Sequence, residues 1–264
     1  MRGQMTSFDV ARIVVELRAL IGSRARKAYH PHWEQVVLRL NPKEEPQVDL
    51  VIVRGKRIYL SRRDRPMPPQ PSPFSMVLRK HLMNGRLVDV RQHAFDRILI
   101  LEFDTKDGMR SVVVEMFRDG NILLLDAAGV IVQPLTNVKY AKRTLKRGEK
   151  YESPPAQVDP RTMTLEEFSE LLDGSDSGLV ATLASRANLA GVYAEAACER
   201  ADVDGQRMAA ELDEEEVAAR ETPVDRAMQA RTLAMRTQTV EDTREIADIL
   251  GRESATAMQD ASDL

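Results

Sequence analysis

The sequence is poor in cysteine and has no long apolar run. Cys198 is the single cysteine among 264 residues, so no disulfide framework can form within the chain, and we expect a reducing, cytoplasmic location. No apolar run approaches the about 18 residues that cross a bilayer. Residues 1–8 also lack the apolar core of a signal peptide. We therefore expect neither a membrane partner nor export.

The sequence motifs of many cofactor and metal enzymes are also absent. The chain contains no Gly-x-Gly-x-x-Gly, no Gly-x-x-x-x-Gly-Lys-Ser/Thr and no Gly-x-Ser-x-Gly. Zinc requires clustered Cys and His ligands. The one close histidine pair, His30 and His32, belongs to His30-Pro31-His32-Trp33, which we expect to form a turn. We predict no cofactor, no metal site, no small-molecule substrate and no enzymatic activity, although the sequence leaves a Ser-His-Asp triad open.

Charge is distributed unevenly along the chain. Residues 1–150 hold 28 Lys and Arg against 16 Asp and Glu, a net charge of +12, whereas residues 151–264 hold 10 against 25, a net charge of −15. A basic region of this kind is a candidate nucleic-acid surface, and a plain solvated surface is the alternative. The opposite signs imply that the two regions meet different partners.

Hydrophobic periodicity predicts a β-rich first region with two helices. One helix is expected over residues 6–20 and another over residues 74–82, after a loop at 64–73 that holds five prolines in ten residues. The predicted strands are 25–30, 35–40, 48–53, 56–60, 87–93, 97–103, 111–116, 121–126 and 130–132. Further helices are expected near 164, over 178–187 and 191–201, and, rich in acidic residues, over 213–220 and 224–249.

Four segments taken together carry a family resemblance. They read FSMVLRKHL at 74–82, FDRIL at 95–99, VEMFRDGNILLLD at 114–126 and LASRANLAGVYAEAACERA at 183–201. In this order and spacing they resemble the NFACT N-terminal domain followed by a helix-hairpin-helix domain. The family includes the ribosome quality-control proteins RqcH of bacteria and archaea and NEMF of animals, and some bacterial members are called fibronectin-binding protein A. One departure is Phe117, where family members often have glycine.

The resemblance implies an α+β fold and a domain order. It places an NFACT N-terminal domain at 5–152, expected as a β-sandwich with flanking helices and similar to the N-terminal domain of formamidopyrimidine-DNA glycosylases. A linker at 153–160 and an all-α helix-hairpin-helix domain at 161–210 follow. Residues 211–264 are expected to form an acidic helical extension, a candidate stub of the family's coiled coil. Full-length members continue with that coiled coil and a second NFACT domain, so we expect an N-terminal part or a short member.

The resemblance also implies a function. Family members bind tRNA and the large ribosomal subunit that carries peptidyl-tRNA, and they support mRNA-independent C-terminal tailing of stalled nascent chains, with alanine in bacteria and archaea. Their work is to position tRNA rather than to catalyse a reaction. The chain is therefore expected to be an RNA-binding factor of ribosome-associated quality control.

The family's Asp-Arg pair maps onto Asp96 and Arg97, which implies a role for both in tRNA handling. A guanidinium can bind a phosphate through two hydrogen bonds or stack on an unpaired base. From the sequence alone the pair could equally be a local ion pair. Further phosphate-binding candidates are Arg79, Lys80 and Arg118.

Two further segments are implied as ribosome or tRNA contacts. Glu115, Met116 and Phe117 match a family segment of this kind, and a buried strand end is the alternative. Gly191 lies in a helix bend, where backbone N–H groups can face a phosphate, and a helix hairpin that only packs is the favoured alternative because its surroundings are acidic.

Two other functions are compatible with parts of the resemblance. Formamidopyrimidine-DNA glycosylases use an N-terminal proline nucleophile beside a glutamate, but this chain begins Met1-Arg2-Gly3-Gln4, so that chemistry does not carry over. A DNA-processing relative of these enzymes and a protein-interaction module of the fibronectin-binding type stay as alternatives to RNA binding.

Overall fold

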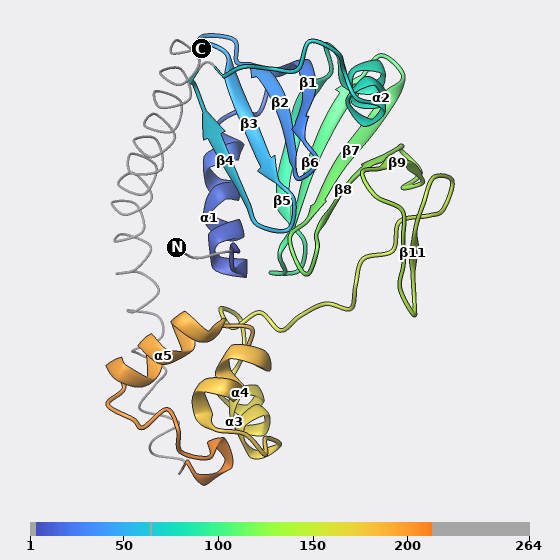
Figure 1. The fold of residues 1–264 in the computed structure, drawn as a ribbon. Helices are drawn as coiled ribbons and strands as arrows, with labels where there is room; N and C mark the ends of the chain where they lie inside the picture. Colours follow the sequence, from blue (N-terminus) through green and yellow to red (C-terminus); the bar gives the residue numbers. More distant parts are fainter. Residues whose placement is uncertain (1–3, 64, 213–264) are drawn as a thin grey trace, which may run out of the picture. The chain divides into compact units, whose positions relative to one another are not determined.

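A computed structural model describes residues 4–63 and 65–212 of the chain (Figure 1). The chain divides into two compact units. The first comprises residues 1–160 together with Asn188–Ala190, and the second holds residues 161–187 and the chain from Gly191 onward. The acidic helices predicted over 213–220 and 224–249 lie outside the described residues.

The first unit is built on one nine-stranded antiparallel sheet in the order β4-β3-β2-β1-β5-β6-β7-β8-β9. Its strands are β1 (Arg24–His32), β2 (Gln35–Asn41), β3 (Val48–Val53), β4 (Arg57–Ser61), β5 (Arg86–Gln92), β6 (Ile98–Thr105), β7 (Gly108–Glu115), β8 (Asn121–Leu125) and β9 (Ile131–Pro134). A separate two-stranded sheet, β10 (Val138–Lys139) and β11 (Thr144–Leu145), was not predicted from the sequence.

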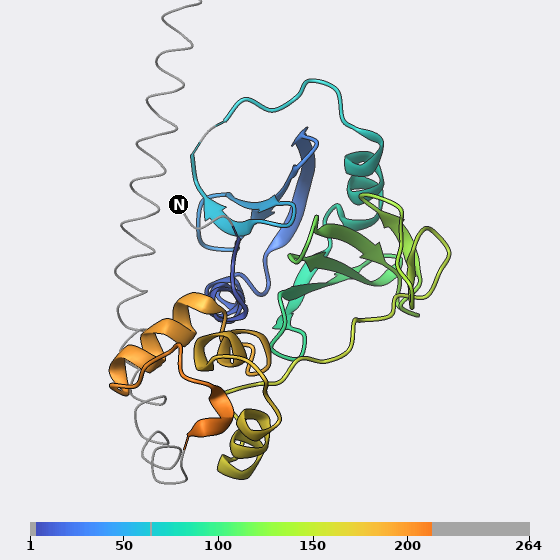
Figure 2. The same ribbon diagram turned by 60° about the horizontal axis from the view of Figure 1, so that its bottom comes forward.

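The nine strands form two halves that share a core. The β1–β5 ladder has one register pair, Arg24 with Arg86, and Figure 2 shows the blue strands of the first half turning away from the green strands of the second. The main core contains Leu38 and Leu50 from one half and Leu101 and Leu124 from the other. By its pairing the structure is thus one continuous antiparallel sheet whose two halves share a core, where the resemblance implied a β-sandwich.

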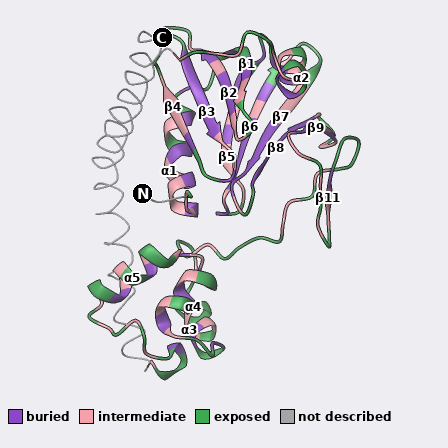
Figure 3. Cartoon of the chain, in the orientation of Figure 1, coloured by how far each residue is buried: buried purple, intermediate pink, exposed green. Residues whose placement is uncertain are grey.

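Two helices cover the core of this unit. Helix α1 (Ser7–Arg18) begins with a capping box between Thr6 and Asp9, and α2 (Pro73–Leu82) begins after Ser72, with proline in its first turn, where the missing N–H costs nothing. Each helix buries one apolar stripe, visible as purple segments in Figure 3. The buried apolar residues are Val10, Ile13, Val14 and Leu17 in α1 and Phe74, Leu78 and Leu82 in α2.

The predicted turn at His30–Trp33 is shorter than expected. Strand β1 continues through Pro31 to His32, and only Trp33 and Glu34 form the turn before β2. Proline cannot donate to a ladder and is tolerated at bulges, and the β1–β2 register shifts between Tyr29 and His32. The irregular pairing therefore accommodates Pro31 inside the strand.

The described part of the second unit is helical. It contains α3 (Leu165–Asp173), α4 (Leu179–Ser185), α5 (Gly191–Arg200) and a short 3-10 helix, Ala209–Glu211. Helix α3 begins with a capping box between Thr164 and Glu167, which confirms the predicted helix start. Cys198 is buried in α5. That this unit is a helix-hairpin-helix domain stays a prediction. No helix among the described residues is long and apolar enough to span a bilayer.

Candidate nucleic-acid interface

The turn between β5 and β6 carries Asp96 and Arg97. Ala94 and Phe95 both adopt positive φ, 41° and 51°, which is uncommon for residues with a Cβ. The turn is fixed from inside, because the buried Phe95 ring packs edge-on against Phe8 with ring centroids 4.8 Å apart. A strained turn held by packing is typical of a functional loop.

Asp96 positions Arg97 through the backbone. Asp96 is a buried residue, with 8% of its surface exposed, and its Oδ1 accepts the Arg97 backbone N–H at 2.6 Å. The Asp96 N–H in turn donates to the His93 carbonyl at 2.8 Å. Among the described residues no ion pair joins the Asp96 and Arg97 side chains. The Asp96 carboxylate instead accepts a hydrogen bond from the backbone of the turn, so the local ion pair that the sequence left open does not form.

A second set of contacts ties this turn to the start of α1. The Gln92 side-chain amide donates to the Ser7 carbonyl at 2.8 Å and to the Asp96 carbonyl at 2.9 Å. Within the same unit, the Asn188 amide donates to the Phe95 carbonyl at 3.0 Å, and the Ser7 hydroxyl donates to Asn188 Oδ1 at 3.3 Å. Three segments far apart in the sequence thus hold the backbone of the turn.

Arg97 and Arg118 meet through Gln4. The partly exposed Arg97 side chain donates from Nη1 to Gln4 Oε1 at 3.4 Å, and Gln4 Nε2 donates to the Arg118 carbonyl at 3.4 Å. The Met116 N–H donates to the Arg97 carbonyl at 2.8 Å, which aligns the start of β6 with the end of β7. The structure therefore brings two predicted RNA-binding arginines to one end of the sheet.

Two glycines allow the turns at this end to approach closely. Gly55 and Gly120 both have φ of 65°, and a Cβ added to Gly120 would lie 2.2 Å from the Gly55 nitrogen. Arg54 Nε donates to the Gly120 carbonyl at 3.0 Å. The β3–β4 turn is thereby packed against the β7–β8 loop that carries Arg118.

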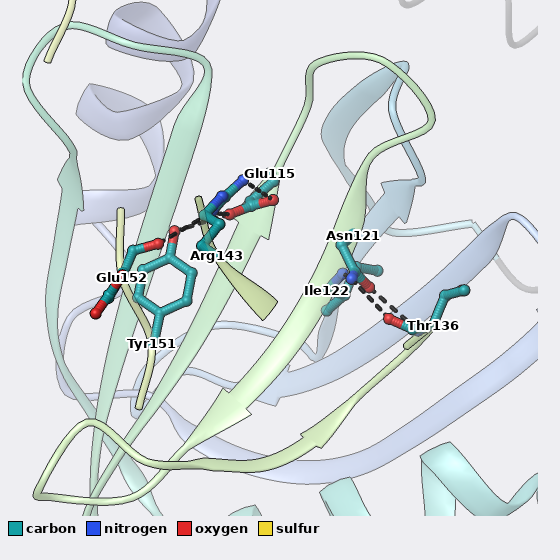
Figure 4. Close-up of polar contacts among 7 residues, drawn as sticks. All are labelled: Glu115, Asn121, Ile122, Thr136, Arg143, Tyr151 and Glu152. Atoms are coloured by element: carbon teal, nitrogen blue, oxygen red, sulfur yellow. Dashed lines mark hydrogen bonds and ion pairs between the residues drawn. The ribbon is translucent and has the colours of Figure 1, made fainter. Parts of the chain in front are cut away.

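Glu115 is buried in a polar network, drawn in Figure 4. Its side chain is 1% exposed, and its carboxylate accepts two bonds from the Arg143 guanidinium, at 2.5 and 3.0 Å, and one from the Tyr151 hydroxyl at 3.0 Å. Burial and the Glu115 charge raise the pKa of Tyr151 well above its ordinary value. Burial alone lowers the pKa of Arg143, but the hydrogen bond and charge of Glu115 outweigh it and raise that pKa.

This network sets the surroundings of Arg118. The Arg143 guanidinium also stacks on the rings of Tyr140, 4.9 Å away, and Phe117, 5.7 Å away. The exposed Arg118 guanidinium lies 6.0 Å from the centre of the Tyr140 ring. Met116 is fully buried. In this segment the exposed cation is Arg118, whereas the Glu115 and Met116 side chains face inward.

The two basic residues of α2 have different settings. Arg79 Nε donates to the Ala28 carbonyl at 2.7 Å, and its guanidinium stacks 5.0 Å from the Tyr29 ring, so this side chain already ties α2 to β1. Lys80 is exposed. The contacts of Arg79 are with β1, whereas those of Arg97 are with Gln4, so the predicted residues form two groups rather than one.

Gly191 begins α5 and is exposed, and a Cβ added there would meet nothing within 4 Å. Gly191 is therefore not required by the close approach of another part of the described chain. Within the part of the chain that the structure describes, no group of three or more His, Cys, Asp and Glu residues could hold a metal ion.

Sequence reasoning missed Gln4, Arg143 and Asn188. Arg143 belongs to the basic residues 139–150 and lies between Tyr140 and Tyr151 in the sequence, and these two tyrosines were the available signal that it packs. Gln4 and Asn188 had no usable signal, because each acts on a residue more than 90 positions away in the sequence.

Fold and site define a class of protein: an α+β domain with a folded antiparallel sheet whose end gathers arginines, followed by a helical unit. The chain belongs to the NFACT family, since the family model for the NFACT N-terminal and middle domains matches residues 6–255.

Relatives of the chain carry ribosome quality-control names. The archaeal Rqc2 homolog aRqcH of Methanocaldococcus jannaschii is 35% identical over 228 residues, which cover 82% of this chain and 34% of that protein. The human ribosome quality control complex subunit NEMF is 29% identical over 186 residues, covering 67% of this chain and 17% of that protein. The chain thus spans about a third or less of the length of these relatives.

Solved structures share the fold. The N-terminal domain of the fibronectin-binding protein PavA from Streptococcus pneumoniae superposes with a TM-score of 0.62 at 26% identity, covering 74% of this chain and 81% of that one. The N-terminal part of the fibronectin/fibrinogen-binding protein from Streptococcus suis gives 0.63 at 23% identity, with 84% and 85% covered. The latter likeness concerns the fold alone.

Proposed function

We propose that the chain is the RNA-binding part of a cytoplasmic ribosome-associated quality-control factor. It binds tRNA and the large ribosomal subunit and supports mRNA-independent C-terminal tailing, with alanine, of stalled nascent chains. It positions tRNA and catalyses no reaction. The observation that carries the proposal is the setting of Arg97, a partly exposed arginine on a rigid turn beside a second, exposed arginine.

The geometry suits phosphate binding. Arg97 is held by its backbone on both sides, through Asp96 and Met116, while its side chain has a long 3.4 Å contact with neutral Gln4. A phosphate offers a charge-assisted, bidentate bond in place of that contact. The backbone of Arg97 is fixed, and its guanidinium can exchange the Gln4 contact for a phosphate. This lowers the conformational entropy that binding must remove.

Glu115 and Met116 act in this proposal from behind the surface. Glu115 anchors the 139–152 segment through Arg143 and Tyr151, and Met116 pairs with Arg97 through the backbone. A direct contact with RNA would require both side chains to leave buried positions. Phe117 is half-buried against Arg143. In this proposal it supports the surface at which Arg118 and Tyr140 contact the RNA.

A tRNA-binding titration at several salt concentrations tests the proposal. Binding is expected to weaken linearly in log–log form, with a slope set by the number of phosphates contacted. Arg97→Ala should weaken binding and make the slope shallower by about one ion. Arg86→Ala is the matched control, because Arg86 is exposed at the opposite end of β5 and carries the same charge. An equal loss of tRNA affinity in both variants would contradict a specific role of Arg97 and indicate only binding to a diffuse basic surface.

A second candidate is a protein-interaction module of the fibronectin-binding type, on the strength of the likeness to PavA. Surface-immobilised fibronectin distinguishes the two, because a protein-binding module should bind it with an affinity that Arg97→Ala leaves unchanged. Nicking of damaged duplex DNA would instead indicate a relative of the glycosylases.

A further inference from the structure

Trp33 is the single tryptophan of the chain, and it is 61% exposed at the tip of the β1–β2 hairpin. It occupies a two-residue turn with Glu34, where Gly, Asn, Asp or Pro is the usual choice. Burial of an indole is worth more than that of most side chains, so this tryptophan contributes little to the fold where it stands. Its exposed ring needs another explanation.

The hairpin tip is anchored at its base. His30 Nδ1 lies 3.0 Å from the Ser72 hydroxyl at the start of α2, and His30 Nε2 lies 3.5 Å from the Trp33 carbonyl. On the other side, the Arg54 N–H donates to the Glu34 carbonyl at 2.7 Å. The indole is thus presented by a fixed backbone, which limits the conformational entropy that a ligand must remove.

The indole has an aromatic neighbour, and the adjacent β3–β4 segment is basic. The exposed His32 ring lies 5.6 Å from the indole at an angle of 45°. The neighbouring β3–β4 turn, Arg54-Gly55-Lys56, is followed by Arg57 at the start of β4, and Lys56 reaches Glu34 at 3.0 Å while its side chain stays 47% exposed. An exposed aromatic ring beside cations fits an unpaired nucleotide, since the ring stacks on the base and the cations meet the phosphates.

This tip is physically continuous with the Arg97 end of the sheet. Gly55 lies against the backbone of Arg118 and Asp119, and the Met5 N–H donates to the Lys56 carbonyl at 2.8 Å. Gln4, next to Met5, links Arg97 and Arg118. A bound RNA strand can therefore reach the hairpin tip and the arginines together.

We propose that Trp33 is a stacking platform for an unpaired base of the bound RNA. This inference rests on the proposed function, which it deepens by naming single-stranded nucleotides as the part of the RNA that reaches the β1–β2 hairpin. Stacking on an aromatic ring tolerates any base, so the platform adds affinity without sequence preference.

Intrinsic fluorescence tests the proposal directly, because emission from a single tryptophan reports on this position alone. A short oligouridine should quench Trp33 emission in a saturable way, and a blunt RNA duplex of the same length should quench it far less. Equal quenching by duplex and single strand would overturn the stacking proposal.

Binding of oligouridine and tRNA to substituted chains gives the second readout. Trp33→Ala and Trp33→Leu should weaken binding on the order of tenfold, whereas Trp33→Phe should retain most of it. Val15→Ala removes part of another well-exposed apolar side chain, from α1, and should change nothing. If Trp33→Leu binds like Trp33→Phe, aromatic stacking is excluded.

The two proposals fail differently. If Arg97→Ala loses tRNA while all Trp33 variants bind like the unchanged chain, only the stacking platform is wrong. If the unchanged chain binds no RNA, both are wrong. Thermal unfolding of each variant shows whether it folds, and no substitution at these exposed or partly exposed positions should alter the midpoint by more than a few degrees.

Discussion

Glu115 and Arg143 form a bidentate ion pair that fixes the segment around β10 and β11 to the end of β7. The two side chains are 1% and 9% exposed, and Tyr151 supplies a third hydrogen bond to the carboxylate. A buried ion pair is stable only while both partners are present, because removal of one leaves the other charge buried and uncompensated. The Phe117–Arg118 corner therefore depends on Arg143, a residue 28 positions after Glu115.

Removal of one member of this pair should destabilise the fold strongly. Arg143→Ala leaves the Glu115 carboxylate buried without its cation, and the expected loss is about 3–5 kcal/mol in the free energy of unfolding. Denaturant unfolding measures it. Arg62→Ala is the control, because the Arg62–Glu45 pair is well exposed and exposed pairs contribute little. Similar small losses in both variants would contradict a structural role for the Glu115 network.

Much of the fold could be predicted from sequence because it depends on local periodicity. The nearly continuous apolar runs in 35–40, 48–53 and 111–116 predicted buried strands, and the apolar spacing after Thr6 marked α1. The bend of the sheet could not be predicted, since it depends on a single β1–β5 pair, Arg24 with Arg86. Strand β1 also extends through Pro31 only because its pairing is irregular there.

The candidate site divides in the same way. Asp96 and Arg97 stand out as neighbours in sequence, so a motif finds them. The contacts that give them their geometry come from Gln4, Ser7 and Asn188, which only the folded chain brings near. Burial of Glu115 likewise depends on Arg143, which lies 28 positions away among the basic residues 139–150.

The Tyr151 hydroxyl should make stability fall at high pH. Its pKa is raised in the folded chain by burial and by Glu115, so the folded state retains a proton that the unfolded state loses above about pH 10. The associated stability is present below that pH and is lost as pH rises through it, with a slope of up to about 1.4 kcal/mol per pH unit. Tyr151→Phe, which cannot ionise, should show a flatter dependence in denaturant unfolding between pH 9 and 11. Parallel curves would contradict this assignment.

Gly120→Ala should disrupt the contact between the β3–β4 turn and the β7–β8 loop. The new methyl carbon would lie 2.2 Å from the Gly55 nitrogen, and both partners are backbone that cannot rotate away. Gly129→Ala is matched for backbone strain, since φ is 77° at Gly129, but nothing lies within 4 Å of its added carbon. Gly129→Ala should cost about 1–2 kcal/mol from positive φ alone, and Gly120→Ala clearly more, with weaker tRNA binding because Arg118 moves. Equal losses in the free energy of unfolding would show that the β7–β8 loop moves aside at little cost.

Two substitutions at Asp96 separate a positioning role from direct contact with RNA. Asp96→Asn keeps an oxygen that can accept the Arg97 N–H but removes the negative charge, whereas Asp96→Ala removes the acceptor and leaves that N–H unsatisfied, at a cost of about 1–3 kcal/mol. If Asp96 only holds the turn, Asp96→Asn should bind tRNA nearly as well as the unchanged chain and Asp96→Ala should bind as poorly as Arg97→Ala. A carboxylate that accepts bonds from a base edge predicts the reverse for Asp96→Asn, which would then lose binding while keeping its stability. Titrations of tRNA and unfolding midpoints of the same two proteins decide between these mechanisms, because only the positioning role ties the loss of binding to the loss of the backbone hydrogen bond.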